Sequence, residues 1–379
     1  MEIETEELKE LRRELHKYPE LSGKEHNTAR LLKTYLKKYK PDEIIDNIGG
    51  HGFAVIYRSN NPGSTILFRA DLDALPINEV NNFSYKSQHE GISHKCGHDG
   101  HMTILTGLAQ AISQNRPQKG SVILLFQPSE ENGEGAEKVI NDPKFKSLKP
   151  DYVYALHNLP GFPKGSIIIN PNIFASASKG LIVKLTGKTS HAGEPENGIS
   201  PAIAMADLVK ELTYLPSKQY FENFVLITVI YARLGEIAFG TSPGYAEVMA
   251  TLRSYTNEDM ESLVKQSKQI IVNLSDQNNL KYKINWTEEF LATKNTKQSV
   301  DIIQQAAESS DIEVITKDKP FHWSEDFSHF TYKFPGALFG LGSGENTPQL
   351  HNPDYDFPEE IIIPGVKIFC EIFKRHLNQ

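Results

Sequence analysis

Cysteine is scarce in this chain of 379 residues, which contains only Cys96 and Cys370. The two could pair on count alone. However, Cys370 lies in the apolar register of the final predicted helix, "GVKIFCEIFKRHL", where a buried free thiol is the expected state. Cys96 lies in "SHKCGHDGHM" (93–102), together with three histidines and one aspartate. The chain therefore places one of its few thiols in a cluster of side chains that bind metals or act as nucleophiles.

Long apolar runs and basic surfaces are also missing. No stretch approaches the apolar length that a transmembrane helix needs. The N-terminal "MEIETEELKELRREL" is acidic and then helical, so we expect no signal peptide. The formal net charge is −8, and no Lys/Arg-rich stripe with interleaved aromatic residues is present. We therefore expect a cytoplasmic protein that binds neither nucleic acid nor membranes.

The chain length and the order of its predicted elements indicate two domains. In the first half, apolar strands alternate with helices, which is typical of an α/β sheet covered by helices on both faces. From about residue 178 the order becomes strand–helix–strand–strand–helix–strand, the pattern of an α+β, ferredoxin-like domain with its own antiparallel sheet. We predict one α/β domain over 1–177 and 294–379, and an inserted domain over 178–293.

Chemically reactive side chains collect where the predicted strands end. A single histidine is more often structural than functional, and a glutamate pair is usually solvated. Ligands, however, bind at the carboxyl ends of strands in α/β sheets, so several reactive groups at one sheet edge predict a site. They are Asp71 and Asp73 after "TILFRA", Glu130 and Glu131 after "SVILLF", His157 at the end of "DYVYAL", Cys96 and His98 before a helix, and His351 after a Gly-rich turn.

These residue types favour a metal site. Thiolate, imidazole and carboxylate together suit zinc, and they also accommodate manganese, nickel or cobalt. A pair of metals roughly 3.5–4 Å apart would need about this many ligands, with one anionic group between them. Because neighbouring residues at a strand end point to different sides, one of Glu130 and Glu131 can bind metal while the other acts as a general base.

Nucleophilic alternatives are weaker. A Cys–His hydrolase could use Cys96, but the histidine of such a pair usually comes from a distant segment. No G-x-S-x-G motif occurs in the sequence, and "GLGSGEN" lacks the lysine of a phosphate-binding loop. Within the cluster itself, His94 and His101 are interpreted as structural. Asp99 is expected to cap the following helix or to brace a ligand.

The ordered motifs resemble a known family of metal-dependent amidohydrolases and metallopeptidases, which includes aminoacylases, carboxypeptidases and indole-acetyl-amino-acid hydrolases. The resemblance runs nearly from end to end. It rests on "LRRELHKYPELSGKEHNTARLL", "RADLDALPINE", "HKCGHDGHMTILTGLA", "QPSEE", "GKTSHAGEPENGISP", "SEDFSHF" and "GSGENTPQLHNPDYDFPEE". It implies a zinc-peptidase-like catalytic domain with a central mixed sheet, and an inserted domain that serves as a lid and in dimerisation.

The resemblance also implies a role for each residue. Two divalent ions (Zn, Mn, Ni or Co) would be bound by a set of five ligands, and Glu130 would be the general acid/base. His191 would stabilise the oxyanion from the partner subunit of a homodimer. Arg253 would hold a substrate carboxylate or, equally, form a structural ion pair in the lid. The implied ligands are Cys96, His98, Glu131, His157 and His351, with Asp71 and Asp73 behind them.

One position departs from the family pattern. Gly240, in "AFGTSPGYAE", stands where relatives usually carry an asparagine that faces the substrate. The departure leaves the chemistry intact but puts the inherited substrate specificity in doubt. The resemblance implies hydrolysis of an N-acyl amino acid. The alternatives are a dipeptidase or carboxypeptidase of the same family, acting on short peptides, and a non-catalytic metal-binding protein that keeps the fold.

Overall fold

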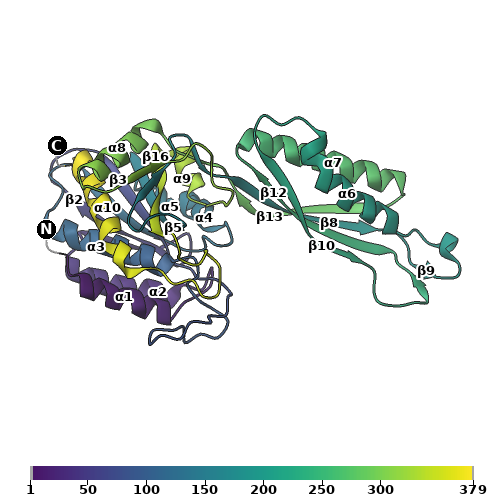
Figure 1. Ribbon diagram of the computed structural model, residues 1–379, viewed down its shortest axis with the longest axis horizontal. Coiled ribbons are helices and arrows are strands. Elements are labelled where there is room, and N and C mark those ends of the chain that lie inside the picture. The colour runs from purple at the N-terminus through teal and green to yellow at the C-terminus, as the bar shows by residue number, and fades with distance from the viewer. Residues whose placement is uncertain (1–2, 378–379) are drawn as a thin grey trace. The chain divides into compact units, whose positions relative to one another are not determined.

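The computed structural model describes residues 3–377, which form two compact units (Figure 1). The large unit consists of the chain up to Phe174, residues 293–319 and the chain from Asp326 onward. The small unit consists of residues 175–292 and 320–325. The small unit begins and ends close to the expected 178–293, and it also contains residues 320–325, which were expected in the large domain. This segment packs with the small unit because the backbone N–H of Ser176 donates to the Phe321 carbonyl, 3.1 Å away.

The large unit is built on an eight-stranded mixed sheet, counted over the described residues, in the order β1-β2-β4-β3-β5-β16-β6-β15. The inner strands β4, β3, β5 and β16 are mutually parallel. Their carboxyl ends therefore lie along one edge. The strands are β1 (Glu43–Ile48), β2 (Gly52–Arg58), β3 (Thr65–Asp71), β4 (Ser121–Gln127), β5 (Tyr152–Pro160), β6 (Ile167–Ile169), β15 (Val314–Thr316) and β16 (Gly336–Gly344).

Helices cover both faces of this sheet, which gives the mixed α/β architecture that the sequence predicts. The long helix α3 packs against α1 and α10. The helices are α1 (Thr5–Lys17), α2 (His26–Leu36), α3 (His98–Gln114), α4 (Gly135–Asn141), α5 (Pro143–Lys146), α8 (Lys297–Glu308), α9 (Ser328–Lys333) and α10 (Ile362–Leu377), with short 3₁₀ turns at Lys37–Tyr39 and Glu359–Ile361.

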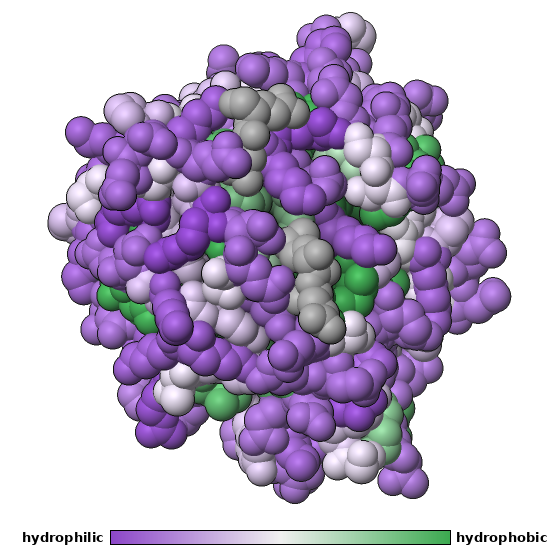
Figure 2. Space-filling model, turned by 90° about the vertical axis from the view of Figure 1, so that its left-hand side faces the viewer, coloured by the Kyte–Doolittle hydropathy of each residue, from purple (hydrophilic) through white to green (hydrophobic). Residues whose placement is uncertain are grey.

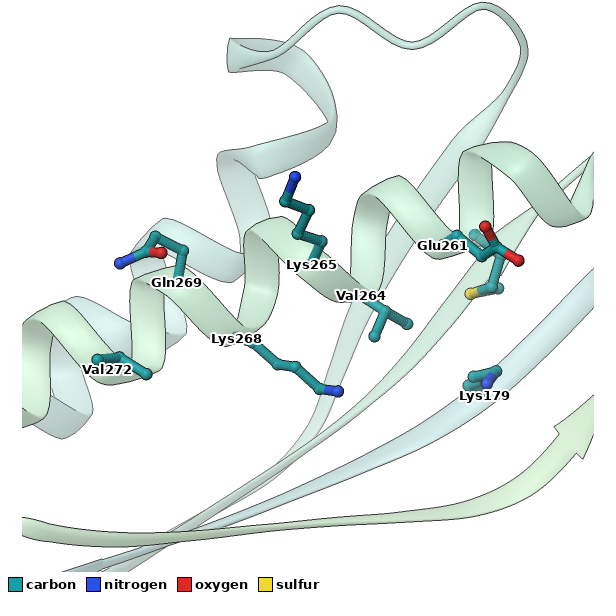
Figure 3. A pocket seen from close by; sticks show the side chains of 8 residues that line it. Lys179, Glu261, Val264, Lys265, Lys268, Gln269 and Val272 are labelled. Atoms are coloured by element: carbon teal, nitrogen blue, oxygen red, sulfur yellow. The ribbon is translucent and has the colours of Figure 1, made fainter.

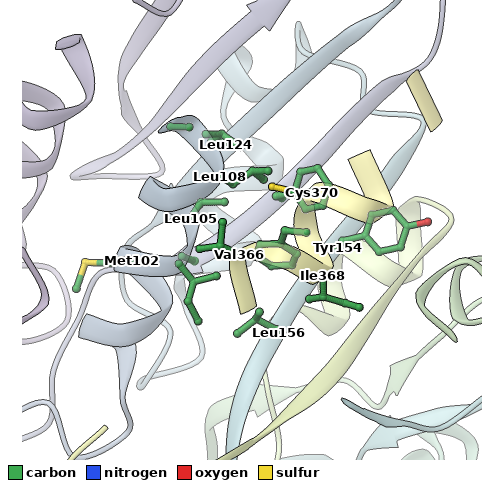
Figure 4. Close-up of a cluster of buried hydrophobic side chains, with 14 of the residues drawn as sticks. Met102, Leu105, Leu108, Leu124, Tyr154, Leu156, Val366, Ile368 and Cys370 are labelled. Atoms are coloured by element: carbon green, nitrogen blue, oxygen red, sulfur yellow. The ribbon is translucent and has the colours of Figure 1, made fainter. Parts of the chain in front are cut away.

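The core between α3, α10 and the sheet fixes the position of α3 (Figure 4). Leu105 and Leu108 of α3 lie close to Val366 and Cys370 of α10, and all four side chains are buried. Burying one such aliphatic side chain stabilises the fold by about 1.5–3 kcal/mol. Cys370 is a free thiol, as predicted, and so is Cys96. Because α3 begins at His98, this core also anchors the Cys96–His98 segment.

The small unit has a four-stranded antiparallel sheet in the order β10-β12-β8-β13, with α6 and α7 on one face (Figure 1). Along β12, alternate residues from Ala246 to Ser254 are buried, because one sheet face packs on the helices. The elements are β8 (Ala177–Thr186), α6 (Ala202–Lys218), β10 (Val225–Leu234), β12 (Tyr245–Ser254), α7 (Asn257–Gln277) and β13 (Lys281–Phe290), and their order is the predicted one.

Four short strands complete the fold. In the small unit, β9 (Ser190–His191) pairs with β11 (Thr241–Ser242), and a 3₁₀ turn follows at Pro195–Asn197. The strands β7 (Ile173–Ala175) and β14 (Thr293–Lys294) lie where the chain passes between the units. Within residues 3–377, no helix is long and apolar enough to cross a membrane. The surface in Figure 2 is largely hydrophilic, with small separate hydrophobic areas.

Candidate metal centre

Three parallel strands carry the predicted residues to one edge of the large sheet. Asp71 is the last residue of β3, and Glu130 follows the end of β4 by three residues. His157 lies within β5, which continues to Pro160 and so does not end at His157 as the sequence suggested. The strand continues because β5 pairs with β16 in parallel as far as Pro160.

Cys96 belongs to two groups of candidate metal ligands at this edge. One group is Cys96, His98 and His157, and the other is Cys96, Glu131 and His351. In each group the ligand atoms lie within 4.8 Å of one another. The thiol Sγ is 3.5 Å from His157 Nε2. The five residues predicted as ligands therefore form two sets that share the Cys96 sulfur.

Hydrogen bonds orient the two buried imidazole rings. Nδ1 of His98 lies 2.9 Å from the carbonyl oxygen of Asp73, and Nδ1 of His157 lies 2.9 Å from that of Asn158. A carbonyl only accepts, so Nδ1 carries the proton in each neutral ring. Nε2 of each ring is left with a lone pair directed into the cluster, as a metal ligand requires.

Buried polar atoms at the centre of the cluster lack partners. His98 Nε2 and Glu131 Oε1 lie 3.8 Å apart, and neither has a hydrogen-bond partner among residues 3–377. Buried polar atoms are almost always paired, so two such atoms facing one another indicate a missing ligand. A divalent cation would satisfy both, since it accepts lone pairs from imidazole and carboxylate alike.

The charge balance agrees with a cation site. Burial raises the pKa of Glu131 to about 7, although His98 lowers it. Burial lowers the pKa of His98, but Asp71, Asp73 and Glu131 outweigh burial and raise it to about 10. Carboxylates thus crowd one buried imidazole and favour a positive charge at this point. The donor set of thiolate, imidazole and carboxylate fits a divalent metal there.

The backbone adopts uncommon conformations around the cluster. Gly97 has φ 87°, and a Cβ at this position would lie 2.7 Å from the Asn158 side chain, so only glycine fits. Ser129, just before Glu130, has φ 58°, and His351 has φ 66°. The His351 N–H donates to the Lys95 carbonyl at 2.8 Å, which brings the C-terminal segment to the cluster. Such conformations persist only where their surroundings enforce them, and they concentrate at functional sites.

The two adjacent glutamates lie in different surroundings. Glu131 faces His98 with one oxygen and His351 with the other, each 3.8 Å away. Glu130 is also buried, with Oε2 4.0 Å from His98 Nε2 and Oε1 3.5 Å from the backbone N of Asp326. Glu131 therefore faces both sides of the cluster, and His98, Glu130 and Glu131 form a further group whose ligand atoms lie within 4.8 Å of one another.

His191 and Arg253 are in the small unit. His191 lies on β9 opposite Thr241 of β11 and is exposed. Arg253 Nη1 donates to the His322 carbonyl at 2.8 Å and to Ser324 Oγ at 3.2 Å. Part of its hydrogen-bonding capacity thus holds the 320–325 segment on the small unit.

Gly240 contacts the His191 segment through its backbone, because its carbonyl accepts the Ala192 N–H at 3.0 Å. A Cβ at Gly240 would meet nothing within 4 Å. Packing therefore does not force glycine at this position.

A buried ionic network behind the cluster was not anticipated from the sequence. Asp99 pairs with Arg12 at 2.9 Å and with His16 at 2.8 Å, so it ties α3 to α1, and its Oδ1 also accepts the Gly100 N–H in the first turn of its own helix at 3.0 Å. Glu79 lies 3.0 Å from His16 and also pairs with the Lys95 ammonium group. The sequence does contain one sign of this network, because Arg12 and His16 fall in the apolar register of α1 together with Leu8, Leu11 and Leu15.

The other two histidines of the motif differ from one another. His101 Nε2 lies 2.5 Å from Asn158 Oδ1, and its Nδ1 lies 3.5 Å from Asp71. It therefore bridges two residues of the centre. His94 is fully enclosed, and burial lowers its pKa to about 3, so it is neutral at pH 7.

A separate groove of about 440 Å³ runs along α7 in the small unit (Figure 3). It contains none of the predicted site residues. It is lined by Lys179, Met260, Glu261, Val264, Lys265, Lys268, Gln269 and Val272.

Comparisons with known proteins agree with this geometry. Residues 67–375 match the peptidase family M20/M25/M40. The chain is 31% identical to the N-acetyldiaminopimelate deacetylase of Exiguobacterium sibiricum, with 97% of this chain and 99% of the relative covered. It is 30% identical to the N-acetyl-L-cysteine deacetylase of Bacillus subtilis, with 97% and 88% covered.

One solved structure has the same fold. It is the Bacillus subtilis YXEP protein, described as a dinuclear metal-binding peptidase from the M20 family. The TM-score is 0.84 at 24% identity, with 99% of this chain and 98% of that chain covered. Fold and sequence together therefore define a chain of the metallopeptidase type. It belongs to the peptidase family M20/M25/M40.

The buried network behind the cluster leads to a prediction for Glu79→Gln. Burial raises the pKa of Glu79, but hydrogen bonds from His16 and Lys95 outweigh burial and lower the pKa from 4.5 to about 2. A carboxyl group whose pKa is lower in the folded state stabilises the fold above pH 4.5. This stabilisation is lost as the pH falls toward 2. We expect the variant to lose on the order of 3 kcal/mol of unfolding free energy at pH 7.

Urea denaturation from pH 7 downward measures this effect. The difference between wild type and variant should narrow below pH 4.5. The exposed Glu90→Gln is the matched control and should change stability by less than about 0.5 kcal/mol. A difference that stays constant across this pH range would contradict the assignment.

Proposed function

We propose that the protein hydrolyses the amide bond of N-acyl amino acids with the help of two divalent metal ions. The observation that carries the proposal is the membership of Cys96 in two ligand groups, with the buried carboxylate of Glu130 beside them. The names of the relatives support the substrate class, since both are deacetylases of N-acetylated amino acids. Both the family and the residues of the site fit a metal-dependent amidohydrolase.

Each group of ligands would hold one ion. Cys96, His98 and His157 would form one site, Cys96, Glu131 and His351 would form the other, and the Cys96 thiolate would belong to both. Asp71 and Asp73 orient the set from behind, since Asp73 holds His98 through its carbonyl and Asp71 contacts His101. When bound, zinc, manganese, nickel or cobalt would polarise the substrate carbonyl and lower the pKa of water.

Glu130 moves the protons of the reaction. Its carboxylate accepts a proton from the attacking water as the oxygen bonds to the amide carbon. It then donates that proton to the leaving nitrogen as the carbon–nitrogen bond breaks. The products are the free acid and the amino acid. Burial near His98 keeps Glu130 close to the reacting atoms and away from bulk water, where general acid/base catalysis contributes about 10²–10⁴-fold.

Two residues of the small unit complete the proposed site. His191 would stabilise the developing oxyanion from the partner subunit. Arg253 would offer its guanidinium to the substrate carboxylate, although its bonds to His322 and Ser324 equally suit a structural role. Gly240 has no side chain that could face the substrate, so assays with different acyl groups and amino acids are needed to define the specificity.

A homodimer would form through the small unit. The strand β10 is an edge of its sheet, and residues 225–232, "VLITVIYA", carry no charge. Leu226, Ile230 and Tyr231 on this strand are at least 39% exposed. An uncharged edge strand of this length is usually covered, and two copies can pair antiparallel about a two-fold axis. We place this homodimer in the cytoplasm, acting on small molecules.

A dipeptidase or carboxypeptidase of the same family differs in whether the acyl group carries an amino group. Parallel assays of N-acetyl, N-benzoyl and dipeptide substrates under several metals separate these activities. Against a non-catalytic metal-binding protein stands Glu130 itself, because a binder needs no base beside its ligands. The non-catalytic alternative would hold if the protein stayed inactive after zinc or manganese was added.

The first test replaces the proposed base. Glu130→Gln should retain both metals and lose about 10²–10⁴-fold in kcat, because the amide cannot accept the proton. Elemental analysis and single-turnover assays measure these quantities. Glu131→Gln is the adjacent control and should lose metal instead. Loss of metal from Glu130→Gln, with an unchanged single-turnover rate after reloading, would exclude Glu130 as the base.

The second test concerns the shared thiolate. Cys96→Asp supplies an anionic oxygen, so it should keep measurable metal and activity, whereas Cys96→Ala should lose both. We expect at least about a 10-fold difference in activity between the two variants. Metal content and deacetylation rate are measured side by side. Equal loss in both variants would show that a shared anion is not what the site needs.

The third test concerns the partner subunit. Mixing Glu130→Gln chains with His191→Ala chains should restore activity, since one site of each heterodimer then has both residues intact. Refolded mixtures are assayed after native mass spectrometry has shown that heterodimers form. Mixtures within each single variant are the controls and should stay inactive. Inactive heterodimers would exclude the proposal that His191 stabilises the oxyanion in the site of the partner subunit.

A further inference from the structure

Asp326, in the "SEDFSHF" motif, is a buried acidic residue for which the proposed chemistry has no use. It precedes α9, belongs to the large unit, and its side chain is fully buried. Its carboxylate accepts three sets of hydrogen bonds from three elements. They come from Arg69 Nη2 of β3 at 2.5 Å, Gln127 Nε2 of β4 at 2.8 and 2.9 Å, and the backbone N of Ala136 in α4 at 2.8 Å.

Two of these donors flank the loop that carries Glu130. Gln127 is the last residue of β4, and Ala136 lies in the first turn of α4. The intervening residues 128–134 include both glutamates and the strained Ser129. Asp326 therefore holds the two ends of this loop together. Its own backbone N also lies 3.5 Å from Glu130 Oε1, at the limit of a hydrogen bond.

Arg69 links this arrangement to the other side of the centre. Its Nη2 pairs with Asp71 Oδ1 at 2.5 Å as well as with Asp326, and its Nε donates to Gln127 Oε1 at 2.9 Å. One guanidinium thus joins the end of β3 to the end of β4. Asp71 in turn lies 3.8 Å from His98 Nε2. A change at Asp326 would be transmitted both to the base and to the carboxylate behind a ligand.

Stability alone gives little reason for this arrangement. Taking charged groups out of water is costly, and apolar side chains of similar volume often stabilise a fold as well or better. Charged hydrogen bonds with fixed directions do, however, define positions more narrowly than apolar contacts do. A base displaced by about 1 Å can lose about 100-fold in rate.

We propose that Asp326 is a positioning residue for catalysis, which sets the orientation of the Glu130 carboxylate by holding both ends of its loop and by presenting its own N–H. The inference rests on the proposed role of Glu130 as the base. Asp326 does not touch the substrate, so its effect passes through Glu130 and appears in kcat, not in substrate binding.

A double-mutant cycle tests this inference. Asp326→Asn keeps the shape but removes the charge that pairs with Arg69. We expect kcat to fall between about 10- and 100-fold, with KM within about 2-fold and both metals retained. In the Glu130→Gln background the same substitution should cost less than about 2-fold, because the group it positions is already gone. The matched control is Asp259→Asn, a buried aspartate of the small unit that accepts backbone N–H bonds from Glu222 and Asn223, and its kcat should not change.

The possible outcomes distinguish a failure of the positioning role of Asp326 from a failure of the role of Glu130 as the base. An unchanged kcat in Asp326→Asn, or an equal loss in both backgrounds, would overturn the positioning role and leave the base assignment intact. Full activity in Glu130→Gln alone would instead overturn the assignment of Glu130 as the base, on which the inference rests. If Asp326→Asn does not fold, Gln127→Met removes one of the same links without removing a charge. Its kcat should fall about 3- to 10-fold in the wild-type background only, and an equal loss in both backgrounds would count against the inference.

Discussion

The Cys96 thiolate is the point on which the rest of the centre depends. Three imidazoles and one carboxylate approach the same sulfur: His98 belongs to its own segment, and Glu131, His157 and the half-exposed His351 come from three segments that are far apart in the sequence. Burial lowers the pKa of the His98 imidazole, but the surrounding carboxylates outweigh burial and raise it to about 10, and within residues 3–377 His98 Nε2 and Glu131 Oε1 have no hydrogen-bond partner. A sulfur that belongs to both ligand groups would let two cations balance these charges, and the proposed chemistry depends on it.

The remainder of the large unit serves to hold that geometry. The core of α3, α10 and the sheet fixes the first turn of α3, and Gly97 brings the chain against Asn158 where no side chain would fit. The ion pair of Asp99 with Arg12 attaches α3 to α1. Such buried pairs are weak as sources of stability, so we attribute their presence to the fixed positions that they impose.

Much of the fold followed from the order of apolar strands and helices. The α/β layering of the large unit and the element order of the small unit follow from hydrophobic patterns, whereas the mixed sheet was implied by the family resemblance. The gathering of reactive side chains at one sheet edge could also be predicted, because the carboxyl ends of parallel strands share an edge. Asp71, Glu130 and His157 needed no knowledge of side-chain contacts to be placed near one another.

What the sequence did not reveal depends on contacts between distant segments. Arg12 and His16 fall on the apolar face of α1, but the sequence does not show that Asp99 and Glu79 are their partners. Asp326 shows no local sign that it spans the Glu130 loop. Residues 320–325 belong to the small unit because of hydrogen bonds to Ser176 and Arg253, which no local pattern encodes. Periodicity predicts which face is buried but not which polar partners meet there.

The shared thiolate can be measured directly by titrating metal-free protein with Co²⁺ while recording the absorbance of the thiolate-to-cobalt charge transfer and the electron paramagnetic resonance spectrum. The account predicts two ions per chain, a charge-transfer band that grows through both equivalents, and magnetic coupling that appears as the second ion binds. A band complete after one equivalent, with a second ion that is magnetically independent, would contradict a cysteine shared by two metals.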